Sequence, residues 1–298
     1  MSLRTERIKY IAAVVLYGTI GMFLRFVELP SELVAMCRGI IGSVFILLFM
    51  ASRGRRPDKD AIKRNLIWLL LSGVGLGLNW IFLFAAYVKT TVAIASLCNY
   101  MAPIIVIVVS PLLLKEKLDK RKMPCVLAAL LGIVLVSGVF GGEIGDPAGV
   151  VMGLAAALCF TGIVLCNRKL KDIPALDRSV VQLAVSAITI LPYVILHNPD
   201  GIVRPDLRSI LIVLMLGILQ TGVAYCLYFS GMAYLPVQTI AILGYLEPVV
   251  SVFCSAVFLH EKMSVWGWIG AALILLAAVV SESLPEQKSC VLDEDMIN

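Results

Sequence analysis

The sequence predicts an all-α integral membrane protein whose ten transmembrane helices form two five-helix repeats of inverted topology. The first observation is composition: 60% of the 298 residues are hydrophobic and only 15% are charged, against roughly a quarter charged in a soluble domain. The second is a series of apolar runs of about 17 to 25 residues, the length that a helix needs to cross a ~30 Å hydrocarbon core. The third is an internal repeat that spans five of these runs.

Short polar connections separate the ten predicted spans. Because ten is an even number, both termini are expected on the same side of the membrane. The eight cysteines include no C-x-x-C pair and mostly lie inside apolar runs, so they are interpreted as small core residues. The predicted spans are 8–25, 31–50, 66–87, 91–114, 123–140, 147–166, 177–196, 209–229, 235–259 and 265–282.

The basic residues predict the orientation of the chain. Most of the 25 Lys and Arg lie in connections on one side, such as Arg53, Arg55 and Arg56 after the second span and Lys115 and Lys117 after the fourth. Cytoplasmic loops carry this excess of positive charge. We therefore expect a multi-pass protein of the plasma membrane with both termini in the cytoplasm. The same distribution explains the net charge of +5 without a nucleic-acid partner.

The internal repeat relates the two halves of the chain by a constant offset of 145 residues. Five spans separate the copies, and an odd number makes the second copy enter the membrane from the opposite side. Inverted repeats of this kind are found in alternating-access transporters, and a duplicated scaffold without transport activity is the alternative. The repeats are expected at 1–143 and 144–283, before a short cytoplasmic tail at 284–298. The matched residues are Tyr100 with Tyr245, Pro103 with Pro248, Glu116 with Glu261 and Lys117 with Lys262.

These features resemble a known family. Arg38 within the second span, the Leu246-Glu247-Pro248 motif and the paired endings LLLKEKLD and VFLHEKMS are similar to the EamA-type ten-helix branch of the drug/metabolite transporter superfamily. The resemblance extends to about residue 283. It implies a secondary transporter, commonly an exporter of amino acids, other metabolites or toxic compounds. It also implies a central cavity lined largely by helices 1, 3, 4, 6, 8 and 9. Many relatives carry Gly-Glu where this chain has Lys115-Glu116 and His260-Glu261.

Glu247 lies near the middle of the ninth span, where an ionisable side chain costs about 2.5–3.5 kcal/mol on insertion scales. Pro248 follows it and frees a carbonyl one turn earlier, so the helix is expected to bend there. In one interpretation Glu247 bonds to backbone donors or a hydroxyl at this bend. In the other it takes up a proton or binds a substrate ammonium group. Glu247, Pro103 and Pro248 are the predicted coupling or gating residues.

Arg38 lies about seven residues, or roughly 10 Å, inside the outer end of the second span. Three roles are open to it. It could extend outward to the interface, bind carbonyls at a helix end, or bind a substrate carboxylate through its planar fork.

Aromatic and amide side chains form the rest of the predicted binding surface. Trp80, Phe84 and Tyr87 share one face of the third span, as Thr221, Tyr225 and Tyr228 do in the eighth. Ordinary core packing and, for Tyr87, an interfacial aromatic belt are the alternatives. The predicted substrate-binding residues are Arg38, Asn79, Trp80, Asn99, Tyr100, Tyr225, Tyr228 and Tyr245.

Small residues in the fifth and tenth spans predict close helix packing, either between these two helices or at a homodimer contact. They include Ala128, Ala129 and Gly132, and Gly267, Gly270 and Ala271.

The sequence carries no nucleotide-binding or metal-binding motif, and its two histidines, His197 and His260, fall at span ends. We therefore expect no cofactor, no metal and no enzymatic activity. The expected activity is export of a small metabolite by alternating access, with proton coupling as one option. A gradient-independent facilitator or exchanger is the main alternative. A membrane-embedded enzyme acting on lipid-linked substrates is a remote one, because no histidine accompanies Glu247.

Overall fold

The computed structural model describes residues 3–102, 104–106, 108–109, 121, 123–136, 146–197, 205–232, 243–244, 246–262 and 264–284. Within these ranges the regular secondary structure is helical. The elements are α1 (Leu3–Gly18), α2 (Ile20–Leu24), α3 (Ser31–Ser52), α4 (Lys59–Arg64), α5 (Leu66–Lys89), α6 (Val92–Asn99), α8 (Met123–Val136), α9 (Pro147–Asn167), α10 (Ala175–His197), α11 (Leu207–Gly217), η2 (Ile218–Val223), α12 (Ala224–Met232), α14 (Leu246–Phe258) and α15 (Val265–Ser283).

Six of the predicted spans are present as helical segments long and apolar enough to cross a membrane. Shorter apolar helices occupy 92–106, 123–132, 246–258 and 265–277. The predicted spans 91–114, 123–140 and 235–259 run into residues outside the described ranges. The described chain is therefore an all-helical, multi-pass membrane protein. The six long segments are Arg4–Leu24, Ser31–Ser52, Leu66–Lys89, Pro147–Asn167, Ala175–His197 and Leu207–Tyr228.

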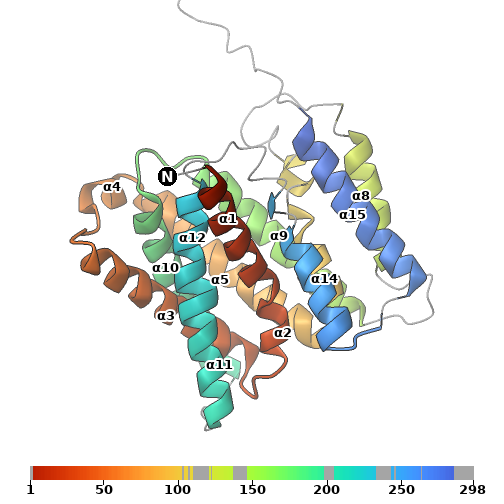
Figure 1. Ribbon diagram of the computed structural model, residues 1–298, viewed down its shortest axis with the longest axis horizontal. Coiled ribbons are helices and arrows are strands. Elements are labelled where there is room, and N and C mark those ends of the chain that lie inside the picture. Colours follow the sequence, from red (N-terminus) through yellow and green to blue (C-terminus); the bar gives the residue numbers. More distant parts are fainter. Residues whose placement is uncertain are drawn as a thin grey trace, which may run out of the picture.

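The long helices pack side by side, and α5 contacts α3, α6, α9 and α10 (Figure 1). α1 packs against α12 and α14, and α8 pairs with α15 at one flank. α1 begins and α15 ends at the edge of the molecule where α4 also lies (Figure 1). Helices from the two ends of the chain meet in the middle of the bundle, because α1 contacts α14.

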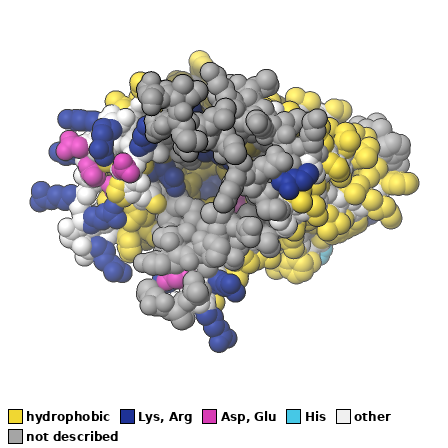
Figure 2. Space-filling model, turned by 90° about the horizontal axis from the view of Figure 1, so that it is seen from above, with side chains coloured by type: hydrophobic (Ala, Val, Ile, Leu, Met, Phe, Trp, Pro, Cys, Tyr) yellow, Lys and Arg dark blue, Asp and Glu magenta, His cyan; other side chains and the backbone are white. Residues whose placement is uncertain are grey.

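Large apolar side chains cover the outer faces of the helices. Leu48, Ile67, Ile188 and Leu196 are each more than 60% exposed. An apolar surface of this extent is unfavourable in water but suits contact with lipid. Figure 2 shows Lys and Arg side chains gathered at one end of the molecule, with hydrophobic side chains over the opposite end.

Two of the long spans are irregular near their middle or end. The first changes at Thr19, between α1 and α2, and the eighth contains the π-helical turn η2 between α11 and α12. A π-helical turn holds one more residue than an α-helical turn, and such turns are frequent at functional sites. The Thr221 hydroxyl donates a hydrogen bond to the Leu216 carbonyl oxygen at 2.9 Å. Neither irregularity was predicted from the sequence.

α8 and α15 are in direct contact, as the small residues of the fifth and tenth spans allow. A Cβ atom added to Gly132 would lie 2.8 Å from the Gly270 carbonyl oxygen and 2.7 Å from Cγ1 of Ile274. The prediction that these two helices pack together is therefore confirmed.

Candidate functional site

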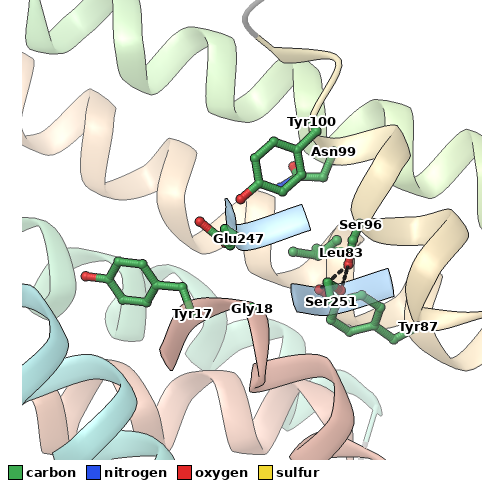
Figure 3. A pocket seen from close by; sticks show the side chains of 9 residues that line it. All are labelled: Tyr17, Gly18, Leu83, Tyr87, Ser96, Asn99, Tyr100, Glu247 and Ser251. Carbon is green, nitrogen blue, oxygen red and sulfur yellow. Dashed lines mark hydrogen bonds between the residues drawn. The ribbon is translucent and has the colours of Figure 1, made fainter. Parts of the chain in front are cut away.

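A pocket of about 250 Å³, open space at its mouth included, lies between α1, α5, α6 and α14. Its wall combines aromatic rings, hydroxyl groups, an amide and one carboxylate. Figure 3 shows these side chains on four helices, with the Tyr17 ring pointing away from the others in this view. The lining residues are Tyr17 and Gly18 of α1, Leu83 and Tyr87 of α5, Ser96, Asn99 and Tyr100 at the end of α6, and Glu247 and Ser251 of α14.

Glu247 is the only acidic residue of this lining. It lies in the first turn of α14 and is half-buried, whereas the following Pro248 is buried. The hydroxyl group of Tyr100 points toward the Glu247 side chain (Figure 3). The end of α1 passes close to the backbone here, because a Cβ atom at Gly18 would lie 2.6 Å from the Glu247 carbonyl oxygen. A glycine at this position thus lets α1 and α14 meet beside the carboxylate.

A chain of hydroxyl groups forms another part of the wall. The hydroxyls of Ser96 and Ser251 are hydrogen-bonded at 2.8 Å (Figure 3), and the Tyr87 hydroxyl lies 3.3 Å from that of Ser96. These bonds connect α5, α6 and α14. Hydroxyl groups both donate and accept hydrogen bonds, so this wall can bind either kind of polar substrate group.

Asn79 lies behind the pocket wall and fixes the side-chain amide of Asn99, which lines the pocket. Its Nδ2 donates to Oδ1 of Asn99 at 3.0 Å and to the Ala156 carbonyl oxygen at 2.8 Å. Asn79 is buried, while Asn99 lines the pocket. The two bonds orient Asn99 and tie α5 to α9, so Asn79 acts on the pocket through its neighbour.

Tyrosine rings from α12 lie behind the α1 wall. The Tyr17 ring lies edge-on to that of Tyr225, with centroids 5.9 Å apart, and at the same distance from that of Tyr228. Tyr228 also contacts Tyr10, whose ring centroid is 4.9 Å away. Tyr225 and Tyr228 therefore support Tyr17 and do not line the pocket themselves.

Arg38 and Trp80 form a second layer behind the α5 wall. The guanidinium carbon of Arg38 lies 4.7 Å from the Trp80 ring centroid and 5.6 Å from that of Phe84. Phe84 in turn stacks on Tyr87, a lining residue, at 6.0 Å. Arg38 Nε donates a hydrogen bond to the Thr221 hydroxyl at 3.2 Å. This layer joins α3, α5 and the π-helical turn.

The structure brings only part of the predicted set to the pocket. Asn99, Tyr100 and Glu247 line it, whereas Pro248 lies beside Glu247 without lining it. Tyr245 and Pro103 lie outside the described residues. The predicted residues that form the second layer are Arg38, Asn79, Trp80, Tyr225 and Tyr228.

Five lining residues were missing from the predicted set altogether, and Tyr87 had been weighed as an interfacial residue. Tyr87 is instead buried, with 7% of its surface exposed. Tyr17 and Gly18 immediately precede the helix change at Thr19, which no sequence pattern marks. The missing residues are Tyr17, Gly18, Leu83, Ser96 and Ser251.

The sequence matches the profile of the EamA-like transporter family twice, over residues 8–138 and 147–282. It is 24% identical to the "Uncharacterized transporter YxxF" of Bacillus subtilis, covering 91% of this chain and 87% of that protein. It is 26% identical to "Protein PecM" of Dickeya dadantii, covering 89% and 92% of the two chains. A crystal structure that is 23% identical shares the fold, with a TM-score of 0.65 over 94% of this chain and 97% of that one.

Proposed function

The chain belongs to the EamA-like transporter family, and from this premise we propose that it is a secondary transporter that exports small metabolites by alternating access. Amino acids or related amphipathic compounds are the proposed substrates. One observation carries the proposal. The pocket takes residues from both regions that match the family, with Tyr17 to Tyr100 from the first and Glu247 and Ser251 from the second.

Alternating access requires two bodies that rock around a fixed site. We propose that residues 1–143 and 144–283 are these bodies, with ten spans in total and opposite orientations in the membrane. In transporters built from inverted repeats, the substrate site lies at the repeat interface near the bilayer midplane. The position of the pocket between α1, α5, α6 and α14 supports this arrangement.

The pocket chemistry supports an amphipathic substrate. Tyr17, Tyr87 and Tyr100 offer aromatic surface, Ser96 and Asn99 offer hydrogen bonds, and Glu247 offers a negative charge for an ammonium group. Ligand sites commonly combine apolar walls with a few placed polar groups in this way.

Glu247 is also the proposed site of proton coupling, with Pro248 and Pro103 as the bends about which the helices gate. A carboxyl group that faces a pocket between the moving halves can exchange a proton with either side in turn. A gradient-independent facilitator or exchanger would use the same pocket without this proton cycle. We propose that the protein lies in the plasma membrane with both termini in the cytoplasm. The orientation rests on the basic residues, most of which lie in the connections on the same side as the termini.

Counterflow in proteoliposomes tests the transport proposal. Vesicles loaded with an unlabelled amino acid should accumulate the labelled one faster than protein-free vesicles do. Ser251→Phe places a large ring in the pocket and should reduce this uptake by at least tenfold. Ser52→Phe, at the exposed end of α3, is the matched control and should leave uptake unchanged.

The melting temperature of each variant in detergent distinguishes pocket filling from unfolding. If the purified chain showed no counterflow of any amino acid, amine, sugar or carboxylate in a metabolite panel, the transport proposal would be wrong. If Ser251→Phe folded and transported like Ser52→Phe, the pocket would not be the substrate path.

A further inference from the structure

Arg38 is a buried cation that forms no ion pair with any residue the structure describes. Its side chain is 3% exposed, and no carboxylate of the described residues forms an ion pair with it. Its Nε bonds to Thr221. The two terminal nitrogens, which carry four N–H groups, have no hydrogen-bond partner among the described residues. A buried charge is ordinarily paired, because leaving it unpaired is unfavourable.

The structural roles open to Arg38 do not fit its surroundings. It does not extend to the interface, because it lies against the rings of Trp80 and Phe84 and is almost completely buried. Within the described part of the chain it does not bind a helix end, because its one hydrogen bond there goes to the Thr221 hydroxyl and not to a carbonyl. Binding of an anion is the remaining role for its terminal nitrogens.

The guanidinium is held in one orientation. Thr221 anchors its Nε edge, and the Thr221 hydroxyl is itself fixed by its bond to the Leu216 carbonyl oxygen. The rings of Trp80 and Phe84 are nearly parallel, 5° apart, and lie against the guanidinium. A close approach of α3 makes this possible, since a Cβ atom at Gly42 would lie 2.5 Å from Cγ2 of Thr221. The edge with both terminal nitrogens makes no hydrogen bond to a described residue.

Arg38 lies one aromatic layer away from the pocket. Its guanidinium carbon lies 5.6 Å from the Phe84 ring centroid, and Phe84 stacks on the lining residue Tyr87 at 6.0 Å. The lining itself contains neither Lys nor Arg. Arg38 therefore lies behind a pocket wall that carries no Lys or Arg of its own, with the Phe84 ring between its guanidinium and Tyr87.

We propose that Arg38 binds a carboxylate group of the substrate through its two terminal nitrogens, and that Thr221 is the residue that positions it. The inference rests on the proposed transport function, because it names the substrate class of the same pocket. A planar guanidinium matches a carboxylate with two parallel hydrogen bonds. One positive charge suits a monoanion better than a phosphate dianion. With Glu247 bound to an ammonium group, the pair selects zwitterionic compounds.

The fluorescence of Trp80 reports directly on this site. Trp68, Trp266 and Trp268 are each more than a third exposed, so replacing all three with Phe leaves Trp80 as the single tryptophan of a folded chain. The probes are the twenty amino acids, their carboxamides, benzoate and inorganic phosphate. We expect at least one carboxylate to change Trp80 fluorescence in a saturable way, with at least tenfold weaker binding of the matched carboxamide. Phosphate at the same ionic strength should have no saturable effect.

Substitutions in the chain that keeps Trp80 as its single tryptophan test the roles of Arg38 and Thr221. Arg38→Gln should abolish the preference for carboxylate over carboxamide, and Arg38→Lys should keep part of it. Thr221→Val keeps the side-chain shape but loses the acceptor, and should reduce the preference several-fold. A merely structural role for Thr221 would alter melting temperature without changing this ratio. Arg53→Gln is the matched control, because Arg53 lies exposed over the Phe49 ring at 5.4 Å.

Three results would overturn the proposal: equal binding of carboxylates and carboxamides, unchanged preference in Arg38→Gln, or no response of Trp80 to any carboxylate. The transport proposal fails separately. Counterflow of uncharged or cationic compounds alone would support the transport proposal but contradict the carboxylate site. Absence of all counterflow would contradict the transport proposal itself.

Discussion

Arg25 and Glu261, which are 236 positions apart, form an ion pair of 2.9 Å between α2 and the connection from α14 to α15. Each side chain has a further partner. Arg25 donates to the Thr90 carbonyl oxygen at 2.8 Å, and Glu261 accepts a bond from the Val92 backbone nitrogen at 3.0 Å. The Ser255 hydroxyl also donates to Glu261. One carboxylate thus joins α2, the start of α6 and the end of α14.

This network indicates a structural role for Glu261, which precedes Lys262 in the second region that matches the family. Glu261 lies beside the first backbone amide of α6, where helix N-termini favour negative charge. It connects the two regions that match the family at the end of the bundle where α14 turns into α15. A transporter that opens at this end must break these bonds.

Glu261→Gln should therefore lower the stability of the described conformation. Hydrogen bonds to charged groups contribute about 1.5–3 kcal/mol each, and the substitution weakens several of them. We expect the melting temperature in detergent to fall by several degrees and a cysteine at Ser255 to label faster. Glu28→Gln is the control, because Glu28 is exposed. Equal melting temperatures of the two variants would show that the network does not hold this end closed.

Glu247→Gln should uncouple transport from the proton gradient. A carboxamide keeps the size and the hydrogen-bonding capacity of the side chain but cannot take up a proton. In proteoliposomes, we expect uptake driven by an imposed pH gradient to be lost while exchange under equal pH continues. Gradient-driven flux that equals wild type would assign the chain to facilitators or exchangers. Melting temperatures measured in parallel show whether the variant is folded.

The sequence predicted the helical fold because hydrophobic length is a local property that every span carries. It also located Glu247, because an acid in mid-span is conspicuous on composition alone. It could not decide which aromatic residues line the pocket. Periodicity places Trp80 and Tyr87 on one helix face, yet only the position of the pocket between α1, α5, α6 and α14 decides which ring lines it.

The π-helical turn explains other differences between prediction and structure. One extra residue in the π-helical turn at 218–223 shifts the direction of the side chains around it. A regular helical period therefore no longer predicts which residues of the eighth span share one face. Tyr225 and Tyr228 consequently pack behind Tyr17. Ser96 and Ser251 were missed for a different reason: single serines in apolar helices are common, and only their mutual hydrogen bond marks them.

Trp80→Ala should affect stability more than substrate affinity. The Trp80 side chain is buried, stacks on Phe84 and lies outside the pocket lining. Truncating a buried aromatic residue typically costs about 3–5 kcal/mol. We expect a lower melting temperature than for Trp268→Ala, at an exposed position. Substrate titration of the folded variant gives the loss of binding free energy, and a loss larger than the loss of stability would place Trp80 in contact with substrate.

Gln220 and Thr19 should show a measurable coupling energy. The Gln220 Nε2 donates to the Thr19 hydroxyl at 2.6 Å and joins the π-helical turn to the change of helix after α1. Oε1 of Gln220 has no hydrogen-bond partner among the described atoms. Gln220→Met removes this buried acceptor together with the bond, so its net effect should stay below about 1 kcal/mol.

A double-mutant cycle with Thr19→Val isolates the bond itself. Hydrogen bonds between membrane helices contribute about 0.6 kcal/mol on average and up to about 1.7 kcal/mol. We expect a coupling energy within this range from unfolding measurements in mixed micelles. Purely additive effects of Gln220→Met and Thr19→Val would mean that the two helix irregularities are energetically independent.

Gly132→Ala should destabilise the α8–α15 pair although it adds a single methyl group. The new Cβ atom would lie 2.8 Å from the Gly270 carbonyl oxygen, well inside contact distance, and backbone cannot move aside as a flexible side chain can. Overpacking of this kind costs about 1–3 kcal/mol.

Gly162→Ala in α9 is the matched control, because no atom lies within 4 Å of its added Cβ. Alanine there should be neutral or stabilising by up to about 1 kcal/mol, since glycine disfavours helices. Unfolding measurements in mixed micelles compare the two variants, and equal stabilities would show that α8 and α15 separate at little cost, so that close backbone approach is not what holds this flank together.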